Sequence, residues 1–307
     1  MKRRSRVIRL VLAAALLFGL QTAAAASAAA EQRKVVDPTG RTVQVPADPR
    51  RVVALAPSVT EIVYALGQEA RLVGVTRYSN YPPAAERLPL VGSYIQLDVE
   101  RIVALRPDLC IAVKDGNPIA AVEQLESLGL AVFAINPLDL ETVMQSVRAV
   151  GGLLGAEPRA ENVVSDMRRR IEKVQARVAQ TTRRPTLFFQ IGVSPIVSVG
   201  SNTFIHTLIE LAGGVNVAAG PSPYPRFSRE QVIALAPEVI VISAMERAAQ
   251  FEQVKAEWMQ WPAIPAVKRQ AVFIAPNDLF ERPSPRLVDA LEVLAAFVHP
   301  ELFKERP

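Results

Sequence analysis

The chain has 307 residues, enough for two domains of about 120 to 150 residues each. It carries 35 Lys and Arg against 30 Asp and Glu, but five of the basic residues lie among the first nine positions. The rest of the chain is therefore close to neutral, which argues against a protein that binds nucleic acid. A single cysteine, Cys110, excludes an intramolecular disulfide and a Cys-rich metal site, and two histidines are too few for a multi-histidine site.

Residues 1–30 have the order of a secretory signal peptide. A basic start is followed by an apolar run from Leu10 to Leu20 and then by an alanine-rich stretch, with cleavage expected after Ala26 or Ala30. The apolar run is shorter than the roughly 20 residues that a membrane anchor needs. Because no cysteine stands near the cleavage zone, a lipid anchor is not expected. The sequence predicts an exported, periplasmic protein.

Strand and helix patterns alternate through residues 31–156. After an exposed leading segment, the apolar run 51–56 precedes Ser58 and Glu61, whose spacing predicts a capping box at the start of a helix that Gly67 ends. Further strands are expected at 72–76, 109–113 and 131–135, and helices at 99–105, 117–128 and 139–154. This alternation predicts a first α/β lobe with a mainly parallel sheet.

Residues 157–182 form the expected connector between two lobes. From Ala160 to Val178 the chain has no glycine or proline, and apolar residues recur three or four positions apart. A helix of about 20 residues with one apolar stripe would span roughly 30 Å. The alternative is an ordinary surface helix of one lobe. A single rigid interlobe helix predicts that the lobes move little on ligand binding.

Residues 183–307 repeat the α/β alternation. Strands are expected at 186–191, 239–243 and 271–275, and helices near 202–212, 228–235, 247–257 and 284–298. The predicted fold class is therefore two similar α/β lobes with mainly parallel sheets, joined by one long interlobe helix, with a ligand cleft between the lobes.

One unit of sequence occurs twice, 130 positions apart. Tyr94 is followed six residues later by Glu100, and Tyr224 is followed at the same distance by Glu230. Each glutamate lies in the first turn of an expected helix, behind a residue suited to cap it, where the helix dipole already favours an acid. Repetition at one spacing also suits a two-lobed receptor that makes one contact per lobe with arginines of a partner.

Several aromatic residues stand outside the periodic segments, in loop-like sequence: Tyr78, Tyr81, Tyr94, Tyr224 and Phe280. Flat rings that line a cleft suit a bulky planar ligand, although loop tyrosines also stabilise turns.

The loop 277–286 directly follows a predicted strand. Loops outside the carboxyl ends of parallel strands commonly carry ligand contacts. Here Asp278, Glu281 and Arg282 are either polar contacts around a ligand or an internal ion pair that shapes the loop.

Motifs of catalysis are absent from the sequence. It has no Gly-x-Ser-x-Gly elbow, phosphate-binding loop, paired-histidine helix or cysteine cluster, and His206 lies in an apolar helical stretch that favours a structural role. We therefore expect a protein that is not an enzyme and that needs no cofactor or metal.

The chain resembles the periplasmic cobalamin-binding proteins of vitamin uptake systems, within the class of receptors whose lobes are joined by one long helix. The resemblance covers essentially everything after the signal peptide and is most specific at 78–83, 97–108, 227–232 and 278–286. Tryptophans are more usual in that family at the positions of Tyr94, Tyr224 and Leu279. The family's frequent disulfide cannot form, because the chain has one cysteine.

The resemblance also implies roles for individual residues. The ligand contacts would be Tyr78, Tyr94, Tyr224, Asp278, Leu279, Phe280, Glu281 and Arg282. Glu100 and Glu230 would dock on arginines of the membrane permease. The implied protein is a monomer that captures cobalamin or a related corrinoid and delivers it to an ABC transporter permease. A haem or ferric-siderophore receptor is the first alternative, and a metal-cofactor oxidoreductase subunit is the second.

Overall fold

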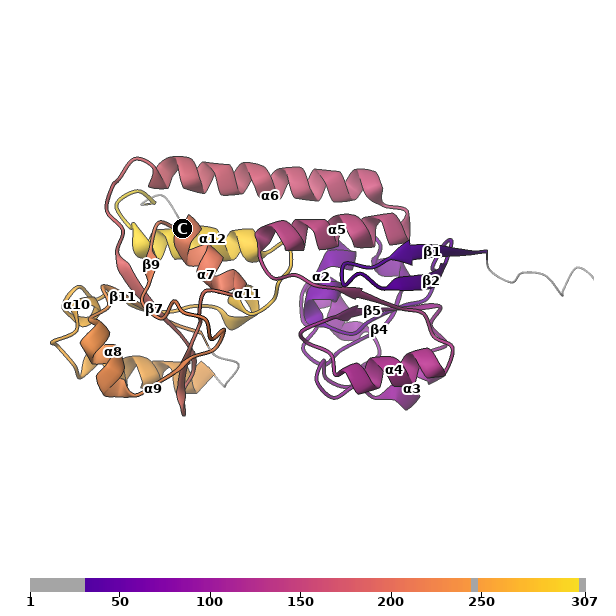
Figure 1. The fold of residues 1–307 in the computed structure, drawn as a ribbon, viewed down its shortest axis with the longest axis horizontal. Helices are drawn as coiled ribbons and strands as arrows, with labels where there is room; N and C mark the ends of the chain where they lie inside the picture. Colours follow the sequence, from indigo (N-terminus) through magenta and orange to yellow (C-terminus); the bar gives the residue numbers. More distant parts are fainter. Residues whose placement is uncertain (1–30, 244–247, 304–307) are drawn as a thin grey trace, which may run out of the picture.

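The computed structural model describes residues 31–243 and 248–303 as two α/β lobes, with helix α6 (Glu157–Val178) running along one side of both (Figure 1). The predicted fold class is confirmed. The predicted signal peptide lies outside the described residues. Within them, no helix combines the length and the apolar character needed to cross a membrane.

The N-terminal lobe contains a four-stranded sheet in the order β4-β3-β5-β6, with every neighbouring pair parallel. Its strands are β3 (Val52–Ala54), β4 (Leu72–Val75), β5 (Leu109–Val113) and β6 (Val132–Ile135). Its helices are α2 (Pro57–Ala65), α3 (Val99–Ala104), α4 (Ile119–Ser127) and α5 (Leu140–Leu154), with 3-10 turns at Glu69–Arg71 and Pro83–Arg87. The central strands are buried along their whole length because helices cover both faces of the sheet.

A hairpin of β1 (Gln32–Val36) and β2 (Thr42–Pro46) precedes this sheet. Its turn covers the outer edge of β6: the Arg41 guanidinium donates to the carbonyl of Val132 at 3.3 Å, and the amide of Ala134 donates to the Asp37 carboxylate at 3.3 Å. The hairpin was not predicted, since only exposed leading sequence was expected before residue 51. It closes an edge that would otherwise leave backbone groups unpaired.

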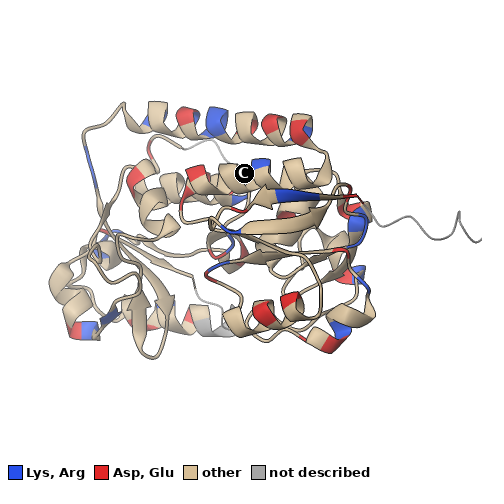
Figure 2. Ribbon diagram, turned by 45° about the vertical axis from the view of Figure 1, so that its right-hand side comes forward, with Lys and Arg blue, Asp and Glu red and all other residues tan. Residues whose placement is uncertain are grey.

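Helix α6 joins the lobes by packing on α5 of the first lobe and on α12 (Leu287–Val298) of the second. The stripe predicted from the spacing is buried, for example at Met167 and Val174, and the outer surface of α6 carries charges of both signs (Figure 2). One hydrophobic cluster continues from the first lobe, beneath α6, into the second. The division of the chain at residues 156 and 183 stays a prediction.

The C-terminal lobe contains a six-stranded sheet in the order β10-β8-β7-β11-β12, with β9 also beside β7. Its strands are β7 (Thr186–Gly192), β8 (Ile196–Ser198), β9 (Val215–Asn216), β10 (Arg226–Phe227), β11 (Val239–Ile242) and β12 (Val272–Ile274). Its other helices are α7 (Phe204–Leu211), α8 (Arg229–Leu235), α9 (Ala248–Met259), α10 (Pro265–Lys268) and α11 (Asn277–Phe280). Strands β8 and β10 add an antiparallel edge that the sequence did not predict.

Of the caps predicted at helix starts, two are confirmed and one is wrong. The caps of α3 and α8 are present, because Asp98 accepts from the amide of Arg101 and Ser228 from the amide of Gln231. The capping box predicted at Ser58 and Glu61 is wrong: α2 begins at Pro57 and has no side-chain cap. Proline at the first position supplies a helical φ by itself, which leaves Glu61 available for other contacts.

Candidate ligand site between the lobes

Three tyrosines from the two lobes lie near enough to interact electrostatically, and we call Tyr78, Tyr94 and Tyr224 the tyrosine cluster. Burial raises the pKa of the Tyr94 phenol, and the neighbouring Glu281, Tyr78 and Tyr224 raise that pKa further through their negative charge. Tyr78 and Tyr224 are 51% and 56% exposed, while Tyr94 is half-buried against the core. The structure thus assembles four of the predicted ligand contacts, two from each lobe.

Asn117 holds Tyr94 in place. Its buried side-chain amide donates to the carbonyls of Tyr94 and Leu55, both at 2.8 Å, and its carbonyl oxygen accepts from the amide of Val113 at 2.8 Å. The Tyr94 loop is thereby fixed to the carboxyl ends of β3 and β5. One feature of the sequence could have identified Asn117, namely its place just beyond a buried parallel strand.

Backbone pairing holds the segment 223–225, which carries Tyr224. The amide of Ser198 donates to the carbonyl of Pro225 at 3.0 Å, and the amide of Gly200 donates to that of Pro223 at 2.8 Å. Across the lobes, the charge of Asp115 adds to burial in raising the pKa of Tyr224.

Glu281 contributes the carboxyl group that acts on Tyr94. Burial raises the pKa of Glu281 to about 7, opposed by a hydrogen bond from Ser243 at 3.4 Å and reinforced by the charge of Asp278. At neutral pH this carboxyl exists in both protonation states, so it can donate or accept a hydrogen bond. A carboxylate is among the charged groups that raise each of the two phenol pKa values, Glu281 for Tyr94 and Asp115 for Tyr224.

A buried ionic cluster beside the tyrosine cluster connects the lobes through Glu61. The carboxylate of Glu61, whose side chain is 2% exposed, accepts from Arg282 at 3.1 Å, Ser284 at 2.5 Å and Arg286 at 3.2 Å. Burial raises the pKa of Glu61, and these three partners oppose the rise. Sequence reasoning missed this role, because the partners of Glu61 lie more than 220 positions away in the chain.

Asp278 and Arg282 are engaged in the same cluster. Arg282 pairs with Asp278 at 2.5 Å and donates to Asn80 at 2.6 Å, while Asn80 donates to Asp278 at 2.8 Å. Of the two roles predicted for these residues, the internal ion pair that shapes the loop is the one observed. Arg282 is 8% exposed, which leaves Asp278 as the more accessible partner for a ligand.

Leu279 and Phe280 are buried residues of the candidate loop. The helical turn α11 leaves Leu279 7% and Phe280 0% exposed. The ring of Phe280 packs against Phe189 of β7 with the centroids 5.4 Å apart. Their apolar surface is thus already covered by the core, and contact of these two residues with a ligand stays a prediction.

Glu100 and Glu230 are exposed residues in the first turns of α3 and α8. These helices belong to different lobes and lie on the side of the molecule away from α6 (Figure 1). A hydrogen bond with the hydroxyl of Ser228 lowers the pKa of Glu230. Their role in docking stays a prediction.

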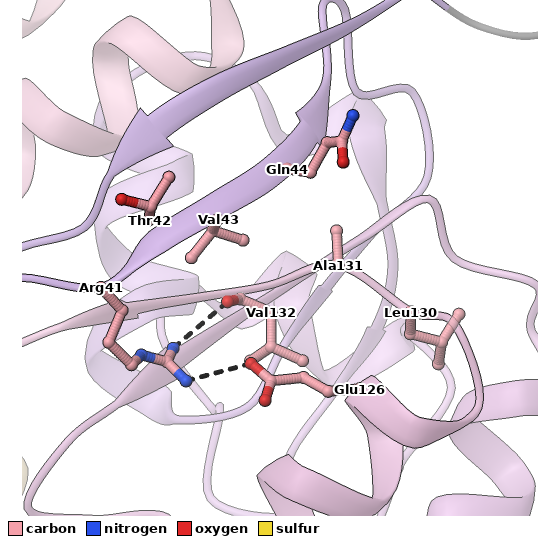
Figure 3. Close-up of a pocket in the computed structure, with 8 residues that line it drawn as sticks. All are labelled: Arg41, Thr42, Val43, Gln44, Glu126, Leu130, Ala131 and Val132. Carbon is pink, nitrogen blue, oxygen red and sulfur yellow. Dashed lines mark hydrogen bonds and ion pairs between the residues drawn. The ribbon is translucent and has the colours of Figure 1, made fainter.

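A cavity of about 340 Å³ lies elsewhere, between β2 and the segment that leads into β6 (Figure 3). Arg41 crosses it to pair with Glu126 at 3.0 Å. None of the predicted ligand contacts lines this cavity, and it contains no aromatic ring. The interlobe residues therefore remain the better candidate for a ligand site.

The histidines and the cysteine have structural surroundings. His206 contacts Asn216 and Glu210, and buried His299 contacts Gly213 and Glu301. Burial raises the pKa of the Cys110 thiol to about 12, as expected for an inert thiol. In the described part of the chain, no group of three or more His, Cys, Asp and Glu side chains is placed to hold a metal.

Comparison with known proteins gives a consistent family. Residues 52–279 match the family described as periplasmic binding protein. A vitamin B12-binding protein of Photorhabdus laumondii is 34% identical over 250 residues, which cover 81% of this chain and 87% of that protein. A vitamin B12-binding protein of Yersinia pestis is 33% identical over 245 residues, which cover 80% and 84%.

Solved structures agree with this fold. The periplasmic vitamin B12-binding protein of Vibrio cholerae superimposes with a TM-score of 0.74 at 29% identity, covering 85% of this chain and all of that one. A periplasmic haem-binding protein from Pseudomonas aeruginosa gives a TM-score of 0.74 at 30% identity, covering 82% of this chain and 93% of the other. The same architecture therefore serves receptors of different tetrapyrroles.

Proposed function

The chain belongs to the periplasmic binding protein family, whose members are substrate-binding transport proteins rather than enzymes, and from this premise we propose that it captures a corrinoid such as cobalamin between its lobes. It would act as a monomer in the periplasm and deliver the ligand to an ABC transporter permease. The observation that carries the proposal is the tyrosine cluster, in which tyrosines from both lobes lie near one another and near Glu281.

The chemistry of the cluster favours an amide-bearing ring over an anionic one. Tyrosine rings offer flat apolar area with a hydroxyl at the end, and a carboxyl that titrates near neutrality can bond the oxygen or the nitrogen of an amide. A corrinoid carries amides around its ring, whereas haem carries propionates and many siderophores are anionic. The carboxylates of Glu281 and Asp115 would repel such anions.

A haem receptor is the second candidate, supported by the similar haem-binding structure. A tyrosine that ligates ferric iron binds as phenolate. Burial and neighbouring negative charge raise the pKa of Tyr94 and Tyr224, which opposes that form. The tyrosine cluster therefore supports haem less well than a corrinoid.

A thermal-shift comparison tests the proposal. The protein is heated with cyanocobalamin, cobinamide, haem or a ferric siderophore in turn. A ligand at a hundredfold excess over its dissociation constant stabilises the fold by about 2.7 kcal/mol. We expect stabilisation by a corrinoid. Stabilisation by haem alone, with a shifted haem absorption band, would replace the proposal with the second candidate, and no effect of either corrinoid would refute it.

Transport by cells tests the docking role. Glu100→Arg and Glu230→Arg should abolish corrinoid uptake and leave ligand affinity unchanged, because each reverses an exposed charge that would pair with a permease arginine. Glu172→Arg, on the outer surface of α6, is the matched control and should transport normally. Lower ligand affinity in the first two variants would show that these glutamates belong to the ligand site instead.

A further inference from the structure

Helix α2 contacts a loop from each lobe through two neighbouring residues, Thr60 and Glu61. The hydroxyl of Thr60 donates to that of Ser79 at 3.0 Å, and Thr76 lies 3.2 Å from the same oxygen, all in a buried position. Ser79 stands between Tyr78 and Asn80. The N-terminal loop that carries Tyr78 is thus attached to α2 at Thr60.

The next residue of α2, Glu61, attaches the C-terminal loop. Both of its carboxylate oxygens accept hydrogen bonds, Oε1 from Arg282 and Arg286 and Oε2 from Ser284. These three donors belong to the segment that immediately follows Glu281. Two adjacent residues of α2 therefore hold the loop around Ser79 in the first lobe and the segment 282–286 in the second.

Two further contacts connect the loops directly. Asn80 bonds to both Arg282 and Asp278, and the guanidinium of Arg286 lies 3.7 Å from the ring centroid of Tyr81. The hydrogen bond between Arg282 and Asn80 and the contact of Arg286 with Tyr81 each use an arginine that Glu61 also holds. Removing the Glu61 charge would therefore release both arginines from one support at once.

Stability alone gives little reason for such a cluster. Burying a carboxylate with two guanidinium groups carries a large desolvation cost, and replacement of buried ion pairs by well-packed apolar residues is often neutral or stabilising. What a charged, hydrogen-bonded cluster supplies is a fixed geometry, since each donor has a defined direction.

We infer that Glu61 is a positioning residue for ligand binding. It holds the loop 278–286 against the loop 78–81, so that Glu281 of one lobe and Tyr78 of the other face the same ligand. Glu61 itself is buried and acts through the two loops that it holds. This inference rests on the proposed function where its test measures the affinity for a corrinoid. Where its test measures hydrogen exchange without ligand, it rests on the structure alone.

The test compares Glu61→Gln and the milder Ser284→Ala with a matched control, Glu292→Gln. Glu292 pairs with Arg170 at 2.7 Å and joins α6 to α12, so its loss also breaks a partly buried interhelical ion pair, but away from the two loops. We expect cyanocobalamin affinity to fall about tenfold or more in Glu61→Gln and about threefold in Ser284→Ala, with less than about a twofold change in Glu292→Gln. Equal affinity in Glu61→Gln and the wild type, or an equal loss in Glu292→Gln, would overturn the inference.

Hydrogen exchange without ligand separates this inference from the proposed function. Amides of residues 78–81 and 282–288 should exchange faster in Glu61→Gln than in the wild type, and should keep their wild-type rates in Glu292→Gln. Unchanged exchange in both loops overturns the inference, whatever the protein binds. If the exchange changes as expected while the wild type binds no corrinoid, the proposed function fails and the coupling of the two loops by Glu61 stands.

Discussion

The two lobes present their tyrosines to the ligand site with different supports. Asn117 ties half-buried Tyr94 to the ends of two parallel strands through three side-chain hydrogen bonds. Tyr224, which is 56% exposed, depends on two backbone hydrogen bonds between the end of β8 and the segment 223–225. A repeated spacing in sequence therefore predicts which residues meet, but not how rigidly each is held. The first lobe offers a fixed ring and the second an adaptable one.

A substitution at Gly200 should disturb the loop that carries Tyr224 most severely. A Cβ at this position would lie 1.8 Å from the carbonyl oxygen of Ser222, a backbone atom, so the loop that carries Tyr224 must shift. We expect Gly200→Ala to weaken cyanocobalamin binding by about a hundredfold, as measured by titration calorimetry.

Gly152→Ala is the matched control for Gly200→Ala. Its Cβ would meet nothing within 4 Å, and in α5 the alanine should be neutral or slightly stabilising. If Gly200→Ala binds as tightly as Gly152→Ala, Tyr224 does not depend on its loop and the contrast between the lobes disappears.

The titration of Glu281 gives the next largest effect. Its pKa is raised from 4.5 to about 7, so between these values the folded protein holds a proton that the unfolded chain has lost. Below pH 4.5 both states are protonated and no stability is lost. As the pH rises through 7, folding must bury an ionised carboxylate, which destabilises the fold by about 3 kcal/mol at most.

Glu281→Gln should therefore be more stable than the wild type at pH 8 and similar to it at pH 4.5, in urea unfolding followed by circular dichroism. The exposed Glu86→Gln serves as the control and should show no such pH-dependent difference. A stability difference that does not vary with pH would show that the pKa of Glu281 is the same in the folded and the unfolded states.

The sequence predicted those helices and strands whose own residues carry an apolar pattern. Strand β5 occupies the predicted residues 109–113, and α6 begins at the predicted Glu157, since an apolar run and a helical stripe need no information from elsewhere. The β1–β2 hairpin and the β8–β10 pair were missed because short strands are defined by their partners. Two residues of β10 have no periodicity of their own.

The candidate site was predictable to the same extent. Tyr78, Tyr94, Tyr224 and Glu281 lie near one another, because loops at matching places in two similar lobes converge, and their contact with a ligand stays a prediction. The burial of Phe280 was not visible in the sequence, since a four-residue helix turns its ring toward Phe189. The roles of Glu61 and Asn117 depend on partners far along the chain, so local sequence assigned the first to a helix cap and gave the second no role.

Asn117→Ala should weaken the support of Tyr94 alone. The substitution leaves the amide of Val113 and the carbonyl of Leu55 without their partner, at a cost of about 1 to 3 kcal/mol. Because the Tyr94 carbonyl is also released, we expect stability and corrinoid affinity to fall together. Urea unfolding and calorimetry measure the two effects.

Asn216→Ala is the comparison for Asn117→Ala in the other lobe. Asn216 bonds to the carbonyl of Val199 and the amide of Ala218, so it has a similar buried role, and these two partners lie outside the segment 223–225 that carries Tyr224. It should lose stability and keep its affinity. An equal loss of affinity in both variants would mean that affinity simply follows stability, and that Asn117 has no special relation to Tyr94.

Exchange of each tyrosine for tryptophan should produce the smallest effects, and in opposite directions. Tyr224 is more than half exposed, so a larger ring has room to add contact area, and Tyr224→Trp should strengthen corrinoid binding by about 1 kcal/mol. Tyr94 is half-buried, with its ring 3.6 Å from the Cβ position of Gly116, and overpacking there should make Tyr94→Trp neutral or weaker. Calorimetric titration with cyanocobalamin compares the two. A gain at Tyr94 that equals the gain at Tyr224 would show that the first ring is as adaptable as the second, because a fixed, packed side chain could not accept the added volume without loss.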